Sequence, residues 1–101
     1  MAVILTPDDI QTLIAELDGW ALSQDGLAIE KTFRFNNFNA AFGWMTRAAI
    51  KAEQLDHHPE WFNLYNRVDV RLTTHDKNGL TDLDASLAKA MDAMASSSGV
   101  K

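Results

Sequence analysis

The sequence predicts an α+β fold in which helices pack on one face of an antiparallel sheet. The order of predicted elements along the 101 residues is helix, hairpin, helix, strand, helix. The predicted strands alternate apolar and polar residues, so each strand has one apolar face. The predicted helices repeat apolar residues every three or four positions. Because the apolar face of a sheet must be buried, we expect the helices to pack on that face. We also expect a single domain over residues 1–101.

The first predicted helix begins at Pro7 and ends before Gly19. Thr6 suits the N-cap, and proline suits the first helical position because its missing N–H is not needed there. The acidic residues 8–9 complement the helix dipole in the first turn. The apolar positions that follow at helical spacing are Ile10, Leu13, Ile14 and Leu17.

A β-hairpin is predicted over residues 20–35. The short segment 20–22 precedes a turn sequence, Ser23-Gln24-Asp25-Gly26. Beyond the turn, apolar residues alternate with Glu30, Thr32 and Arg34. The apolar set, which predicts one buried face, is Leu27, Ile29, Phe33 and Phe35.

A second helix is predicted over residues 38–55, preceded by Asn36 and Asn37, whose side chains suit a helix cap. Its apolar positions recur at helical spacing and predict the buried face. These positions are Phe38, Ala41, Phe42, Met45, Ala49 and Ala52.

One long strand is predicted over residues 64–73, with apolar positions Leu64, Val68, Val70 and Leu72 interrupted at Asn66. Its other face carries Tyr65, Arg67 and Arg71. A weak signal favours a short additional strand at residues 78–80.

The third predicted helix begins near Thr81. Asp84 follows three residues later, which resembles a capping box. Its buried face is predicted to consist of Leu83, Leu87, Met91 and Met94, and residues 96–101 are expected to fray.

Composition excludes several classes of function. The chain has no cysteine, so disulfides, thiolate metal sites and cysteine nucleophiles are excluded, which fits a cytoplasmic protein. The net charge of −5 disfavours direct nucleic-acid binding, because such binding depends on clustered Lys and Arg. The sequence shows no signal peptide and no apolar run of the roughly 20 residues that span a membrane. We therefore expect a soluble protein.

All three histidines lie between positions 57 and 75, at predicted loop junctions. Imidazole titrates near neutrality, at about pH 6.5, so it suits acid–base catalysis. Pro59 restricts His58 to an extended backbone, and neighbouring side chains diverge in extended chain, so His57 and His58 should play different roles. His75 could face the same loop if the strand returns along the sheet. The alternative is that all three are ordinary helix-end and turn residues.

Other chemistries find less support. Three imidazoles can bind zinc, but adjacent ligands on extended chain diverge and the spacing matches no short zinc pattern. No Gly-x-Ser-x-Gly elbow is present. Trp61 is either a core or interface aromatic or a ring that packs on a flat ligand. Glu53, Asp56 and Asp84 are either helix-end carboxylates or groups that orient an imidazole.

The residues around the histidines resemble the pterin-4a-carbinolamine dehydratase family from Trp20 to about Met94. The resemblance implies a four-stranded antiparallel sheet with three helices packed on one face, assembled as a homodimer or homotetramer. The segments that carry it are Glu53-Gln54-Leu55-Asp56-His57-His58-Pro59-Glu60-Trp61-Phe62-Asn63, Tyr65-Asn66-Arg67-Val68, Leu72-Thr73-Thr74-His75 and Gly79-Leu80-Thr81-Asp82-Leu83-Asp84.

The resemblance implies a reaction, which is dehydration of 4a-hydroxytetrahydrobiopterin or a related pterin to quinonoid dihydropterin. This recycles the pterin cofactor of aromatic amino acid hydroxylases and needs no metal or organic cofactor. The implied catalytic residues are His57, His58 and His75, with Glu53 and Asp84 supporting them. The implied substrate-binding residues are His57, His58, Pro59, Trp61, Thr74, His75, Asp76 and Lys77. One departure is Asp69, where animal members tend to carry histidine; we expect it to be exposed and away from the site.

Two alternatives remain from the sequence. Animal relatives also act as dimerisation cofactors of a homeodomain transcription factor, a role that needs an apolar helix face uncovered in the subunit. A dehydratase-like protein could also act on another pterin, as in molybdopterin or folate metabolism. Retention of all three histidines favours catalysis.

Overall fold

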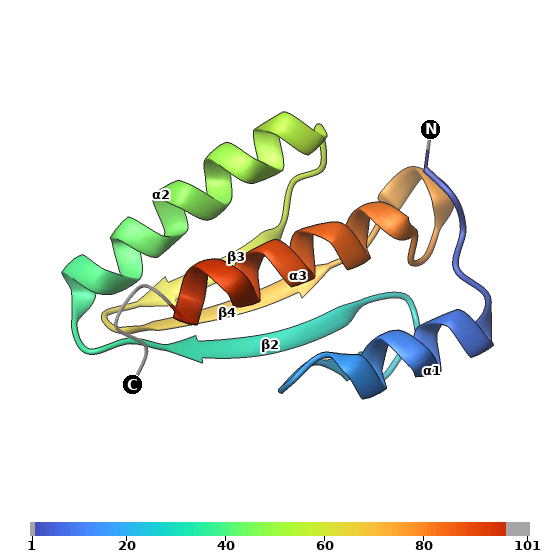
Figure 1. Cartoon of the computed structure of the whole chain (residues 1–101), viewed down its shortest axis with the longest axis horizontal. Helices are drawn as coiled ribbons and strands as arrows, with labels where there is room; N and C mark the ends of the chain where they lie inside the picture. Colours follow the sequence, from blue (N-terminus) through green and yellow to red (C-terminus); the bar gives the residue numbers. More distant parts are fainter. Residues whose placement is uncertain (1, 97–101) are drawn as a thin grey trace.

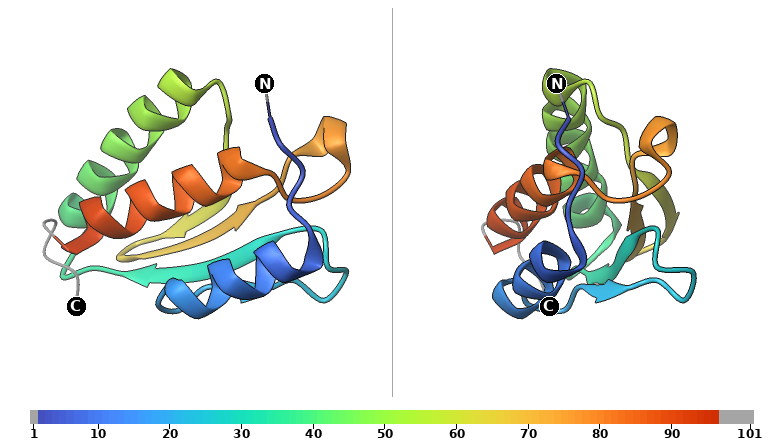
Figure 2. Two further views of the ribbon diagram at one scale, coloured as in Figure 1. Left: turned by 45° about the vertical axis from the view of Figure 1, so that its right-hand side comes forward. Right: turned by 90° about the vertical axis from the view of Figure 1, so that its right-hand side faces the viewer.

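The computed structural model describes residues 2–96 and confirms the α+β class. One antiparallel sheet has the strand order β1-β2-β4-β3, and three helices cover one of its faces (Figures 1 and 2). Of residues 96–101, which were expected to fray, Ser96 is the last residue of α3 and residues 97–101 lie outside the described part of the chain. The elements in order are α1 (Pro7–Glu16), β1 (Ala21–Leu22), β2 (Ile29–Arg34), α2 (Phe38–Leu55), β3 (Glu60–Leu64), β4 (Arg67–Leu72), the 3₁₀ turn η1 (His75–Lys77) and α3 (Asp82–Ser96).

Helix α1 begins as its sequence predicts. The Thr6 hydroxyl accepts a hydrogen bond from the Asp9 N–H at 3.1 Å, and the Asp9 carboxylate accepts one from the Thr6 N–H at 3.0 Å. This reciprocal capping box satisfies two N–H groups that lack helical partners. Gly19, at φ 83°, follows the helix in a left-handed conformation that favours glycine.

The predicted hairpin is confirmed, since β1 pairs antiparallel with β2. Gly26, at φ 75°, adopts a left-handed conformation in the connecting turn. Ile29, Phe33 and Phe35 are buried. Leu27 is half-exposed, so it is not part of the buried face.

Residues 60–72 form two strands where the sequence predicted one. β3 and β4 are joined by Tyr65, at φ 52°, and Asn66, and Leu64 pairs with Arg67 across the turn. Residues that pair across two antiparallel strands lie on the same face of the sheet, so Leu64 lies on the face of Arg67. Successive residues of a strand alternate between the faces, so Val68 lies on the opposite face from Leu64. Leu64 is therefore 56% exposed, whereas Val68 is buried. The predicted strand at 78–80 is wrong, since β3 is the fourth strand of the sheet.

Helix α2 buries part of its predicted face, since Ala41 and Ala52 are buried and Met45 packs against the core, but the other predicted residues are exposed. Phe38 and Phe42 are 47% and 55% exposed, and Ala49 is also exposed. Its buried residues are Ala41, Trp44, Ala48 and Ala52. The three alanines are small enough for close packing, and Trp44 fills the space between the layers.

None of the described helices, α2 included, is long and apolar enough to cross a membrane.

Trp44 is the centre of the core between the sheet and the helices. Its ring centroid lies 4.5 Å from that of Phe33 and 5.3 Å from that of Phe35, both on or next to β2. Its indole N–H donates to the Met91 carbonyl in α3 at 3.1 Å. The same ring therefore joins α2, α3 and the sheet.

The start of α3 is held from two sides. Thr81 caps the helix as predicted, since its hydroxyl accepts from the Leu83 N–H at 3.3 Å and its N–H donates to the Asp84 carboxylate at 2.9 Å. The N-terminal segment runs alongside, where the Asp82 N–H donates to the Val3 carbonyl at 3.0 Å. Leu87 and Met91 of the predicted face are buried, while Leu83 and Met94 lie at its margin.

Candidate active site

His57 lies directly after α2 and is buried against the start of α3. Asp56 ends the helix in a left-handed conformation at φ 51°, and the His57 N–H donates to the Ala52 carbonyl at 3.0 Å. The residue is 8% exposed, and Nε2 of its ring lies 2.5 Å from Oδ1 of Asp84. The helix end and the buried carboxylate together fix this imidazole.

Asp84 is fully buried and accepts hydrogen bonds on both carboxylate oxygens. Oδ1 faces His57, while Oδ2 accepts from the Thr74 hydroxyl at 2.8 Å and from the Thr81 N–H at 2.9 Å. The Thr74 and Thr81 hydroxyls lie 2.8 Å apart. Burying a carboxylate is costly unless hydrogen bonds replace its hydration, and these three donors replace it. Asp84 is thus a rigid partner for His57.

His58 binds a different carboxylate from His57. Its Nε2 lies 2.8 Å from Oε1 of Glu53, one helical turn back in α2. The two side chains are 58% and 80% exposed, so solvent screens this pair and leaves it weak. His58 is therefore a solvent-exposed group next to the buried His57.

His75 begins η1, just beyond the end of β4. Its Nε2 lies 2.7 Å from Oε2 of Glu60, the first residue of β3. Because β3 pairs with β4, the end of one strand lies beside the start of the other. The contact of Thr74 with Asp84 joins residues 74–75 to the start of α3, and the contact of His75 with Glu60 joins them to the start of β3. The structure therefore brings the loops of all three histidines to one end of the sheet.

The three imidazoles share one mode of attachment. Each places Nε2 on a carboxylate oxygen: His57 on Asp84, His58 on Glu53 and His75 on Glu60. An ionised carboxylate has only acceptors, so we infer that Nε2 carries the hydrogen and Nδ1 is the ring nitrogen that can accept a proton. Three such groups at one end of the sheet are suited to transferring protons to and from a single ligand.

The other predicted site residues occupy varied positions. Pro59 is half-buried in the loop, while Asp76 and Lys77 are exposed in η1. Trp61 points toward α2, where its ring centroid lies 6.2 Å from that of Trp44, so its outer part alone can meet a ligand. The Thr74 hydroxyl is taken up by Asp84 and Thr81 rather than free for substrate.

Two residues of the site are absent from the sequence prediction. Thr81 completes the Asp84 network, although the sequence shows it as a helix cap alone. Glu60 binds His75, which is 15 residues away in the sequence. Its position directly after His57-His58-Pro59 indicated that Glu60 could belong to the site. Its contact with His75, however, depends on the pairing of β3 with β4.

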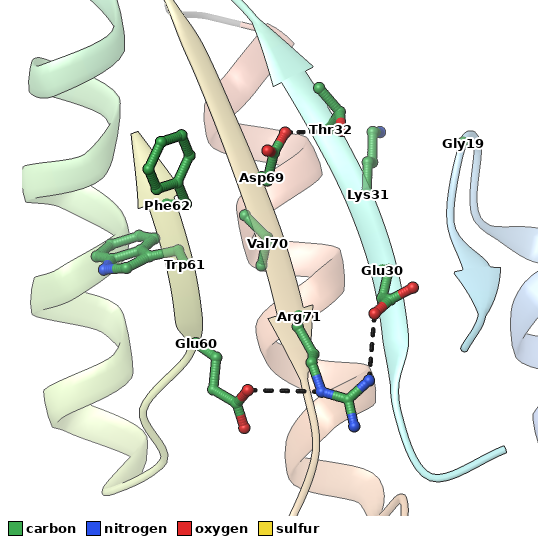
Figure 3. A pocket seen from close by; sticks show the side chains of 10 residues that line it. All are labelled: Gly19, Glu30, Lys31, Thr32, Glu60, Trp61, Phe62, Asp69, Val70 and Arg71. Atoms are coloured by element: carbon green, nitrogen blue, oxygen red, sulfur yellow. Dashed lines mark hydrogen bonds and ion pairs between the residues drawn. The ribbon is translucent and has the colours of Figure 1, made fainter. Parts of the chain in front are cut away.

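A hollow of about 530 Å³ lies on the uncovered face of the sheet (Figure 3). None of its lining residues is a histidine, so the candidate site rests on the imidazole cluster and not on this hollow. Glu60 is common to both, because it lines the hollow and binds His75. The lining residues are Gly19, Glu30, Lys31, Thr32, Glu60, Trp61, Phe62, Asp69, Val70 and Arg71.

The zinc alternative finds no ligand set in residues 2–96. Within that range no group of three or more His, Cys, Asp or Glu side chains is arranged to hold a metal ion.

Comparisons with known proteins agree on one family. Residues 3–94 match the family model described as pterin 4 alpha carbinolamine dehydratase. A relative from Rhizobium rhizogenes is 60% identical over 88 residues, covering 87% of each chain, and one from Novosphingobium aromaticivorans is 58% identical over 87% of this chain and 92% of its own. Both carry the name "Putative pterin-4-alpha-carbinolamine dehydratase". A crystal structure described as a transcriptional coactivator/pterin dehydratase from Brucella melitensis matches with a TM-score of 0.89 and 49% identity, covering 92% of this chain and 99% of that one.

Proposed function

Because this chain belongs to the pterin 4 alpha carbinolamine dehydratase family, we propose that it dehydrates 4a-hydroxytetrahydropterins by histidine acid–base catalysis. The observation that supports this most is the set of three carboxylate-held imidazoles at one end of the sheet. The natural substrate we propose is 4a-hydroxytetrahydrobiopterin or a close analogue, so that the product re-enters the cofactor cycle of aromatic amino acid hydroxylases in the cytoplasm.

The proposed reaction needs two proton transfers. A proton delivered to the 4a-hydroxyl lets that oxygen leave as water, and loss of the N5 proton lets the C4a–N5 double bond of quinonoid dihydropterin form. We assign the transfers to His57 and His75, and substrate binding to the exposed His58 with Pro59 and η1. Such catalysis contributes roughly 10²- to 10⁴-fold. It uses neither a metal nor an organic cofactor.

The decisive experiment follows the decay of enzymatically generated 4a-hydroxytetrahydropterin by ultraviolet absorbance. We expect faster decay with the wild-type protein, loss of that acceleration in the His57→Ala/His75→Ala double variant, and no effect of added chelator. Substrates with different 6-substituents in the same assay separate tetrahydrobiopterin from other pterins. A folded wild-type protein that leaves the decay unchanged would refute the proposal.

We also propose that the subunits assemble as a homodimer or homotetramer through the outer face of α2. This face, made by Phe38, Phe42 and Ile50, is 47–57% exposed in the single chain, and the Phe38 and Phe42 ring centroids lie 5.6 Å apart. An exposed apolar patch of this kind favours association of identical copies. The same face would serve a transcription-factor partner, which the name of the Brucella structure brings into consideration.

A further inference from the structure

We propose that Glu60 is a positioning residue for His75 and that Arg71 holds Glu60 in place. The proposal deepens the dehydratase function above and rests on it for its effect on catalysis. It concerns an ion-pair chain that leads from the uncovered sheet face to the candidate site.

Glu60 binds a different partner with each carboxylate oxygen. Oε2 lies 2.7 Å from Nε2 of His75, and Oε1 lies 3.5 Å from Nε of Arg71. Figure 3 shows the second contact as the carboxylate of β3 reaching toward the guanidinium of β4. One oxygen is therefore directed at the candidate site and the other at the sheet.

The sheet fixes the position of Glu60. Glu60 and Arg71 are paired residues of β3 and β4, so their side chains are neighbours on the same face. Arg71 is held in turn by Glu30 at 3.1 Å and by Asp25 at 3.2 Å. The guanidinium is thus anchored by β2 and by the turn between β1 and β2, and its Nε is left to orient Glu60.

His75 depends on this carboxylate more than His57 depends on Asp84. The His57 ring is enclosed by the helix end and the core, whereas the His75 side chain is 73% exposed in a short 3₁₀ turn. With so little packing around the ring, its hydrogen bond to Glu60 is what selects one orientation. Because Nε2 faces Glu60, Nδ1 on the other side of the ring is directed away from the sheet.

The test combines a ring-mobility measurement with steady-state kinetics on the full-length protein. The variants are Glu60→Ala, which removes the bond, and Glu60→Gln, which keeps an acceptor of the same length. The matched control is Asp69→Asn, a carboxylate on the same sheet face that binds Thr32 and Arg67 but does not touch Glu60. Urea unfolding verifies that each variant is folded.

We expect the ¹³C relaxation order parameter of the His75 ring to fall in Glu60→Ala, to fall less in Glu60→Gln and to stay at the wild-type value in Asp69→Asn. We expect kcat to fall about tenfold in Glu60→Ala with KM changed less than about twofold, because orientation and not substrate binding is lost. A His75 ring that is equally ordered in Glu60→Ala and wild type would overturn the proposal. Since ring order is measured without substrate, it decides this point even if the wild-type protein fails to dehydrate any pterin.

Discussion

Asp84 serves folding and the proposed chemistry through the same three hydrogen bonds. His57, Thr74 and Thr81 donate to it from three different parts of the chain. The capping-box spacing from Thr81 predicts the bond at the start of α3, and the family resemblance predicts a supporting role. The bonds from His57 and Thr74 join residues 27 and 10 positions away, so they depend on how the elements pack and no local pattern specifies them.

Replacing Asp84 by Asn should destabilise the protein by about 1–3 kcal/mol and abolish most of the dehydratase activity. An amide presents one acceptor oxygen and one NH₂ group, so at least one of the three buried donors loses its partner. Urea unfolding measures the stability change. Asp82→Asn is the control, because Asp82 is exposed and accepts a single bond, from the Val3 N–H, that an amide oxygen can keep. Equal unfolding midpoints for Asp84→Asn and wild type would contradict this account.

The β3–β4 hairpin shows why an alternating apolar pattern does not by itself give the bounds of each strand. Phe62, Leu64, Val68 and Val70 continue one apolar alternation through the turn, which is typical of a single strand. The turn contains no glycine, and the left-handed conformation at φ 52° is taken by Tyr65 instead. Its sequence therefore gives little indication of a turn. The face of α2 was predicted only in part, because apolar residues surround that helix and hydrophobicity alone does not show which of them face the core. Ala41 and Ala52 are buried as predicted, whereas Ala49 is exposed.

The helix N-caps, by contrast, could be predicted from the sequence, and the N-cap of α2 offers a test. Oδ1 of Asn37 accepts a hydrogen bond from the Ala40 N–H at 2.8 Å. We expect Asn37→Ala to lower the free energy of unfolding by about 1 kcal/mol, because the N–H loses its partner. The neighbouring Asn36→Ala is the control and should change stability by less than about 0.5 kcal/mol. Thermal unfolding followed by circular dichroism measures both, and equal losses would assign the cap to the wrong asparagine.

The turn of the β1–β2 hairpin should make stability depend on pH in the acid range. Hydrogen bonds from the Ser23 hydroxyl and the Leu27 N–H, followed by the charge of Arg71, hold the pKa of Asp25 below its ordinary value of 3.8. A carboxyl whose pKa is lowered by folding stabilises the protein above its unfolded pKa and loses this contribution as pH falls through the folded pKa. The stability difference between wild type and Asp25→Asn should therefore be constant above about pH 5 and shrink below pH 3.8.

Urea unfolding at a series of pH values measures this difference. Asp18→Asn, a change of the same kind in the exposed turn after α1, is the control. A difference that grows as the pH falls would contradict the sign of the prediction.

At the scale of the whole molecule, the part of the chain that the structure describes leaves apolar surfaces uncovered. One is the outer face of α2, and another is the sheet edge at β3, where Phe62, Leu64 and Tyr65 are 55–59% exposed. Edge strands with unpaired backbone groups and apolar side chains favour pairing with another chain. The family resemblance implied assembly, but the surface that would mediate it was not predicted, because exposure is a property of the folded chain.

Phe42→Glu should shift the protein toward monomers if copies associate through the outer face of α2. A buried, unpaired carboxylate at such an interface is strongly unfavourable. Size-exclusion chromatography with light scattering measures the mass, and Phe62→Glu is the matched change on the sheet. Dissociation by Phe62→Glu with intact assembly of Phe42→Glu would place the interface at β3 instead.

The unequal pairing of the strands also bears on how the molecule opens thermally. β4 lies inside the sheet and pairs with all six residues of β2 and all five of β3, whereas β1 pairs with two residues of β2. Amide protons of β1 should therefore exchange with solvent through local fraying, and those of β4 only when the whole domain unfolds. Thr74 and His75 lie two and three residues beyond the end of β4, so local opening of β1 leaves the strand that positions their backbone intact.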